Sequence, residues 1–185
     1  DPGAAYYVYE CSGEPGRVTG VVAICPVNVL TGSDEAAAES VDALAAARAI
    51  AELKVQPRPV SLAYEASPVM DIILGAAKEG ASLYAVTDPA GITHRAWEVK
   101  REDAVGAIRA MLDQAPEPAL ADDPAYAAAL AGASQLLADE ARAAGTYTGK
   151  EPFNFAVAAL FPAAQVSGGA AQVPTGLLTH QVARF

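Results

Sequence analysis

The chain alternates between strand-like and helix-like segments, and this alternation constrains its fold more than any other feature. The predicted strands cover residues 6–11, 18–25, 60–64, 83–87, 92–99 and 153–161, with a further short strand within residues 116–123. The predicted helices cover residues 34–53, 68–79, 102–114 and 124–144. Amphipathic helices of this kind bury their apolar faces on a sheet. We therefore expect an α/β fold, with α+β as the alternative, in which Ala-rich helices pack on a mixed sheet that contains β-hairpins.

Two strand pairs are predicted to be hairpins because turn-forming residues separate them. Residues 88–91 have the Asp, Pro and Gly placements of a type I turn. The first hairpin, folded about residues 12–16, places Cys11 opposite Val18 and leaves Cys25 on the order of 23 Å further along the strand. We expect no disulfide at that separation. Two reduced thiols in turn favour a cytoplasmic protein.

The helix predicted from residue 68 has the clearest apolar periodicity in the chain. Val69, Ile72, Ile73 and Ala76 recur at i, i+3, i+4 and i+7. This spacing predicts an amphipathic helix with these four residues on its apolar face.

Length and composition favour one domain with a single core. The chain has 185 residues, of which 52% are hydrophobic. We expect one α/β domain over residues 1–165 and a Gly-containing joint with an apolar tail over residues 166–185. The tail carries four large apolar side chains, which are Leu177, Leu178, Val182 and Phe185. These residues are candidates for binding a surface of this chain or of another protein.

The charge of the chain excludes some classes of partner. With 22 acidic and 12 basic residues, its formal net charge is −10, which opposes binding to nucleic acid or to anionic lipid. Its longest apolar run, from Phe155 to Ala164, is interrupted by Pro162 and falls well short of the ~20 residues that a membrane-spanning helix needs. We expect no nucleic-acid or membrane partner.

Candidate catalytic groups are few. His94 and His180 are the two histidines, and neither has carboxylates or thiols at metal-ligand spacing, so we expect no metal site. Strand alternation places His94 on one face with Ala96, which favours a buried, satisfied histidine over a catalytic one. Arg95 lies on the opposite face with Trp97. It is expected to stack on Trp97 or Tyr84, with an anion clamp as the alternative.

Asp122 and Asp123 have two readings. Carboxylate oxygens bind Mg²⁺, so the pair is a candidate for a phosphotransfer site that uses ATP and Mg²⁺ together with His94. Pro124, however, directly follows Asp123. An Asp that caps a helix beginning with Pro explains Asp123 without a ligand.

Five segments of the chain, taken in order, resemble a known family. They are residues 5–9, 20–22, 93–99, 120–122 and 152–162. The His-Arg-x-Trp sequence at 94–97 and the Asn-Phe to Leu-Phe-Pro sequence at 154–162 are the most specific. Together they resemble the uncharacterised bacterial and archaeal family named domain of unknown function number 1015. Members are longer, so the chain is expected to correspond to their middle, and membership implies no defined activity.

The chain departs from the family pattern in two places. Members usually carry a His-Glu pair shortly after the second strand, where this chain has Thr31, Gly32 and Ser33. They also carry Ala-Asp-Gly-His-His-Arg where this chain has the sequence of residues 121–126, Ala-Asp-Asp-Pro-Ala-Tyr. If members transfer a phosphoryl group to a small metabolite with those side chains, this chain lacks them.

These observations leave it open whether the chain is an enzyme, and they favour a non-catalytic function. We expect a degenerate family member that serves as a binding or assembly domain, without a cofactor, and that associates with another protein or with itself. The alternative is a nucleotide- and Mg²⁺-dependent phosphotransferase that acts on a small metabolite through His94, Arg95, Asp122 and Asp123.

Overall fold

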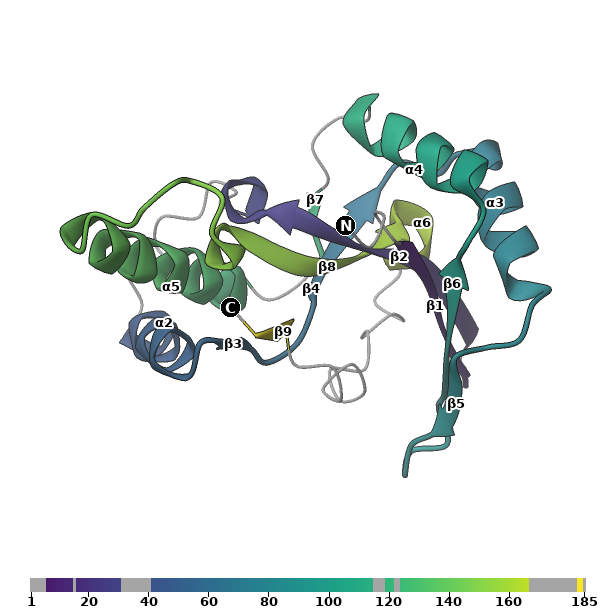
Figure 1. Ribbon diagram of the computed structural model, residues 1–185. Helices are drawn as coiled ribbons and strands as arrows, with labels where there is room; N and C mark the ends of the chain where they lie inside the picture. The colour runs from purple at the N-terminus through teal and green to yellow at the C-terminus, as the bar shows by residue number, and fades with distance from the viewer. Residues whose placement is uncertain are drawn as a thin grey trace. The chain divides into compact units, whose positions relative to one another are not determined.

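The computed structural model describes residues 6–14, 16–30, 41–114, 119–121, 124–166 and 183–184 (Figure 1). Its elements are, in order, β1 (Tyr6–Gly13), β2 (Gly16–Pro26), η1 (Val27–Leu30), α2 (Val41–Leu53), β3 (Val55–Gln56), β4 (Val60–Tyr64), α3 (Pro68–Lys78), β5 (Tyr84–Thr87), β6 (Thr93–Val99), α4 (Glu102–Gln114), β7 (Ala119–Leu120), α5 (Pro124–Ala143), η2 (Pro152–Asn154), β8 (Phe155–Pro162), α6 (Ala163–Val166) and β9 (Ala183–Arg184). Strands and helices alternate along the chain. The expected α/β class is confirmed.

Seven strands form one mixed sheet in the order β5-β6-β1-β2-β8-β4-β7, and β3 pairs separately with β9. The chain divides into two compact units. The first unit contains residues 1–23, 62–119 and 159–177, and the second contains residues 24–61, 120–158 and 178–185. Strands β2, β4, β7 and β8 therefore contribute residues to both units. The expected domain boundary at residue 165 stays a prediction.

The two predicted hairpins are both present in the first unit. β1 and β2 pair antiparallel with Cys11 opposite Val18, as the turn predicts, and Cys11 and Cys25 are both free thiols. β5 and β6 form the second hairpin. β6 also pairs antiparallel with β1, and this pairing places His94 opposite Cys11. The β1–β6 pairing is the contact that brings the two hairpins into one sheet.

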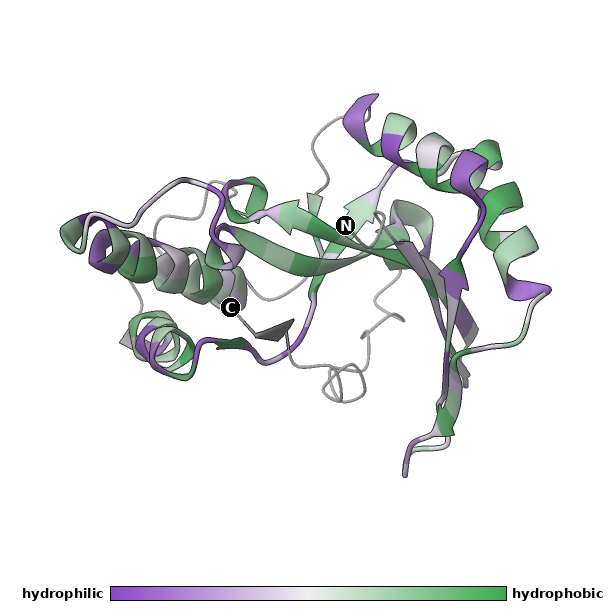
Figure 2. Cartoon of the chain, viewed as in Figure 1, coloured by the Kyte–Doolittle hydropathy of each residue, from purple (hydrophilic) through white to green (hydrophobic). Residues whose placement is uncertain are grey.

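The face that α3 buries differs from the one predicted. Met70 and Leu74 are buried, whereas Val69 and Ile72 are 53% and 71% exposed. α3 is hydrophobic along most of its length (Figure 2). Because both faces carry large apolar side chains, periodicity alone selects the wrong one, and the helix packs on β1 and β6 through Met70 and Leu74.

In the second unit, α2 packs against α5 through small side chains (Figure 1). A Cβ atom added at Gly132 of α5 would lie 3.0 Å from the Cβ atom of Ala47 of α2, so the helices approach closely. Leu44 and Leu53 on α2 are exposed instead. The predicted end of this helix at Leu53 is confirmed. Its predicted beginning lies outside the described residues.

The other predicted elements are confirmed with small shifts. α4 has the predicted bounds, α5 ends one residue early, and β7 lies within the predicted loop. The predicted face of α5 is confirmed, because Leu130, Ala133 and Leu137 are buried. β8 begins two residues later than predicted and includes Pro162, since residues 152–154 form the 3-10 turn η2.

Candidate functional site

Two clusters of polar side chains lie on opposite faces of the same three strands in the first unit. Successive side chains of a strand point to opposite faces of its sheet. On β1, Tyr9 and Cys11 therefore lie on one face and Glu10 lies on the other. We call the face with Tyr9, Cys11, His94 and Ala96 the histidine face. We call the face with Glu10, Arg17, Thr19 and Arg95, to which α3 adds Lys78, the charged face.

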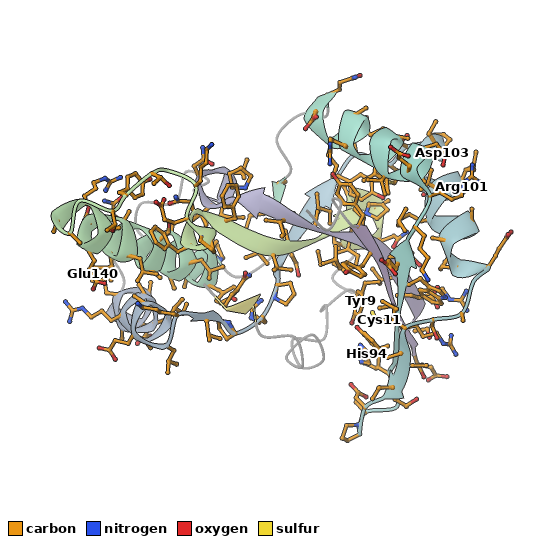
Figure 3. All side chains as sticks on the ribbon, viewed as in Figure 1. Tyr9, Cys11, His94, Arg101, Asp103 and Glu140 are labelled. Carbon is orange, nitrogen blue, oxygen red and sulfur yellow. The ribbon has the colours of Figure 1, made fainter. Side chains whose placement is uncertain are left out.

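The histidine face holds a hydrogen-bonded pair away from solvent. The Tyr9 hydroxyl lies 2.7 Å from Nδ1 of His94, and the two residues are 1% and 0% exposed. Figure 3 shows Tyr9, Cys11 and His94 close together on β1 and β6. Nε2 of His94 lies 3.5 Å from Oδ2 of Asp88, which is an ion-pair distance but too long for a good hydrogen bond.

Asp88 determines which ring nitrogen of His94 carries the proton. Backbone hydrogen bonds from Ile92 and Ala90, together with the His94 ring, lower the pKa of the Asp88 carboxyl. The ionised carboxylate faces Nε2 and favours a proton there. In the neutral ring Nδ1 is then the acceptor, and the Tyr9 hydroxyl donates to it. The three residues form a chain in which Asp88 orients the ring and the ring accepts from Tyr9.

Burial makes the other groups on the histidine face unreactive. Desolvation raises the pKa of the Tyr9 hydroxyl, so the hydroxyl keeps its proton. Burial likewise raises the pKa of the Cys11 thiol. A protonated thiol is a poor nucleophile. The arrangement holds a proton in place and offers no activated nucleophile.

Gly20 and Phe161 close the histidine face. Gly20 lies opposite Tyr9 on β2, and the Phe161 ring packs edge-on against Tyr9 with 6.4 Å between ring centroids. A Cβ atom at Gly20 would lie 2.6 Å from the Phe161 ring and would collide with the Leu160 carbonyl oxygen. Glycine is required here because the β8 backbone and the ring approach β2 too closely for a side chain.

The charged face gathers three cations around one buried carboxylate. The Glu10 side chain is 4% exposed, and its Oε2 atom lies 3.0 Å from Nζ of Lys78 and 3.4 Å from Oγ1 of Thr19. Arg17 Nε lies 3.8 Å from the same oxygen, and an Arg95 amino nitrogen lies 3.6 Å from Oε1. The strand register explains why Thr19 and Arg95 lie beside Glu10, because Glu10 pairs with Thr19 on β2 and with Arg95 on β6.

The structure separates the candidate residues that are adjacent in the sequence. His94 is buried on the histidine face and Arg95 lies on the charged face. The expected stacking of Arg95 on Tyr84 is wrong, because Tyr84 pairs with Ala96 on the opposite face of the sheet. The Arg95 guanidinium faces Glu10, and its stacking on Trp97 stays a prediction. Asp122, Asp123 and the tail residues Leu177, Leu178, Val182 and Phe185 lie outside the described residues. The catalytic use of His94, Asp122 and Asp123 stays a prediction.

Sequence reasoning missed Glu10, Lys78 and Arg17. One signal was present, because Glu10 is a lone acidic residue in an apolar strand, and the first hairpin predicts its pairing with Thr19. Arg95 and Lys78 reach Glu10 through the β1–β6 pairing and the packing of α3, and no local pattern encodes either contact.

Within the described part of the chain, no group of three or more His, Cys, Asp or Glu side chains is placed to hold a metal ion. Nor is any helix of those residues long and apolar enough to cross a membrane.

A comparison with known protein families shows which family this chain belongs to. The sequence profile of the family described as "Protein of unknown function (DUF1015)" matches residues 1–167. The chain belongs to this family. The resemblance seen in the sequence is thereby confirmed. No curated protein and no solved structure matches the chain.

One of the two departures of this DUF1015 chain from the family pattern lies partly within the described residues. Where the pattern ends in His-His-Arg, the chain has Pro124, Ala125 and Tyr126 at the beginning of α5. Tyr126 donates its hydroxyl to the carbonyl oxygen of Arg58, and the Arg58 guanidinium carbon lies 3.8 Å from the centre of the Tyr126 ring. These contacts anchor α5 to the residues before β4 within the second unit.

Proposed function

We propose that this chain is a non-catalytic binding domain that associates with another protein through α3. One observation carries the proposal: α3 exposes a stripe of apolar side chains, those of Val69, Ile72 and Ala76, with Ile73 half-buried beside them, on a different face from the buried Met70 and Leu74. Large apolar side chains gathered on one exposed helix face are typical of protein interaction sites.

The geometry of the stripe suits a partner that covers it from one side. Ile72 is 71% exposed and Val69 is 53% exposed, and residues three apart lie on the same side of a helix. Removing such side chains from water yields roughly 25 cal/mol for each Å² of apolar area that a partner covers. The stripe thus offers binding energy that the described residues do not use in packing against one another.

Charge supports a basic partner. The chain carries a net charge of −10, and the exposed Asp71 lies within the stripe segment of α3. A partner with apolar contact residues flanked by lysine or arginine gains electrostatic attraction, whereas a second copy of this chain meets like charge. We therefore propose a different, basic protein in preference to self-association, and no nucleic acid.

Three observations support a function without catalysis. His94 has no exposed surface, burial keeps the Cys11 thiol protonated, and the chain lacks the two ionisable motifs that the family resemblance leads one to expect. We also propose a cytoplasmic location, because Cys11 and Cys25 are both free thiols and reducing compartments keep cysteines in that state.

Position-specific crosslinking tests the proposal. A photoreactive amino acid is placed at position 72, and in a matched control at position 53, because Ile72 and Leu53 are 71% and 73% exposed on different helices. We expect position 72 to crosslink one basic protein in cells that contain the chain, while position 53 does not. Mixing the purified partner with the purified chain must then give a complex that Ile72→Asp abolishes and Leu53→Asp retains.

Two outcomes contradict the proposal. One is a crosslinking pattern from position 72 that is the same as from position 53. The other is a reconstituted complex that tolerates Ile72→Asp. If sedimentation instead shows dimers of the purified chain that Ile72→Asp dissociates, the partner is a second copy and the preference for a basic protein is wrong.

A further inference from the structure

The charged face carries more positive charge than the described acidic side chains near it neutralise. Lys78, Arg17 and Arg95 surround Glu10, so three positive charges meet one negative charge and the cluster has a formal charge of +2. The chain as a whole carries −10. The charge of this cluster is therefore opposite in sign to the net charge of the chain.

The two arginines keep hydrogen-bonding capacity. Their nitrogens lie 3.8 Å and 3.6 Å from Glu10, which are ion-pair distances beyond the range of a good hydrogen bond. Each guanidinium has five N–H donors, and among the described residues no side-chain hydrogen bond engages those of Arg17 or Arg95. The Arg17 and Arg95 side chains are 64% and 41% exposed, so their donors reach solvent.

We propose that the charged face is a binding site for a phosphate-type dianion, either inorganic phosphate or the phosphate group of a monoester. Two guanidinium groups and an ammonium group match both the charge and the acceptor geometry of a tetrahedral phosphate. A dianion neutralises the excess charge of the cluster completely. This inference uses β1, β2, β6 and Lys78 and does not depend on the proposed protein contact of α3.

Glu10 is the positioning residue of this site. Its carboxylate is 4% exposed and lies beneath the cations, so it draws Lys78, Arg17 and Arg95 together without reaching the solvent side where an anion would bind. The carboxylate also repels that anion. Replacing Glu10 with Gln keeps the side-chain shape and raises the cluster charge from +2 to +3. We therefore expect Glu10→Gln to tighten phosphate binding, an effect that a merely structural ion pair would not produce.

Isothermal titration calorimetry of the full 185-residue chain at pH 7.5 tests the site. The titrants are inorganic phosphate, methyl phosphate, sulfate and, as the reference at equal ionic strength, chloride. We expect saturable binding of phosphate that chloride does not give. Binding of methyl phosphate as tight as phosphate would identify a monoester as an acceptable source, and weaker binding would restrict the site to the free ion. Sulfate, also a tetrahedral dianion, tests whether charge and shape suffice.

Variants assign the binding to this cluster. Arg95→Ala and Lys78→Ala each remove a charge-assisted contact, which weakens binding roughly tenfold or more. Arg17→Ala is the variant that should disturb folding least, because the Arg17 side chain is the most exposed of the three. We expect it to weaken phosphate binding less than the other two variants do. Arg48→Ala is the matched control, because it removes the same charge from an exposed position of α2 in the second unit. It should leave binding unchanged.

Any of three results overturns the proposal. The first is no saturable phosphate binding by the wild-type chain. The second is equal weakening by Arg17→Ala and Arg48→Ala, which indicates a response to net charge alone. The third is a Glu10→Gln protein that stays folded by circular dichroism and binds phosphate no more tightly than the wild type.

Discussion

The two faces of β1, β2 and β6 accommodate their polar side chains in opposite ways. On the histidine face, the Tyr9 hydroxyl hydrogen-bonds with Nδ1 of His94, and Phe161 covers Tyr9. On the charged face, Glu10 is buried, but the cations that neutralise it extend into solvent. The first face is closed and serves stability, and the second is open and available to a ligand. Substitutions on the two faces should therefore lower the free energy of unfolding by different amounts, and these losses should respond differently to salt and pH.

Gly20→Ala should have the largest effect on stability. The added Cβ atom meets the Phe161 ring at 2.6 Å and also the β8 backbone, so the strand itself must shift. We expect the free energy of unfolding to fall by about 3 kcal/mol or more, measured by urea denaturation. Gly16→Ala on the same strand is the control, because its Cβ atom would meet nothing within 4 Å. Equal losses in both variants would show that the histidine face is not closely packed.

Tyr9→Phe should have the second-largest effect on stability. It leaves Nδ1 of His94 buried without its hydrogen-bond partner, which costs about 1–3 kcal/mol. Tyr64→Phe is the matched comparison, because the Tyr64 hydroxyl is buried and makes no hydrogen bond with any residue that the structure describes. That variant should be neutral or slightly more stable. A neutral Tyr9→Phe variant would mean that the Tyr9–His94 pair contributes nothing.

Glu10→Gln should lower the free energy of unfolding by less, about 1 kcal/mol. The cations that it releases are partly exposed, so water solvates them. This loss should shrink further in 1 M salt, which screens exposed charges. The loss from Tyr9→Phe should not change with salt. Denaturation of both variants at low and high salt measures the difference, and an equal salt response would remove the distinction between the faces.

Alkaline pH should produce the most gradual effect. Burial raises the pKa of Tyr64 from 10.0 to about 12, and it also raises that of Tyr9. The folded chain therefore holds these protons more tightly than the unfolded chain, so stability is full below pH 10 and falls as pH rises from 10 to 12. Each tyrosine contributes a slope of up to about 1.4 kcal/mol per pH unit. Tyr64→Phe should reduce the slope, and an unchanged slope would contradict the assignment.

Local sequence signals predicted the parts of this molecule that local contacts determine. The turn at residues 12–16 set the β1–β2 register correctly, and alternation separated His94 from Arg95. Both rules depend on neighbouring residues. The periodicity of α3 failed because both of its faces carry large apolar residues, and only the packed sheet selects Met70 and Leu74.

The candidate site was mostly beyond the reach of sequence reasoning. Glu10 meets Arg95 and Lys78 across 85 and 68 positions of the chain. Those meetings follow from the β1–β6 pairing and from the way α3 crosses it, neither of which a turn or a period specifies. The same is true of the Tyr9–His94 pair, whose members are 85 residues apart.

Phosphate titration followed by NMR of the side-chain nitrogens of both faces tests the central claim most directly. We expect the Nε–H signals of Arg17 and Arg95 to shift saturably with phosphate, while the ring nitrogens of His94 keep their chemical shifts and their proton on Nε2. A shift of the His94 signals that matches or exceeds that of the arginines would contradict it, as would arginine signals that respond to phosphate no more than to chloride.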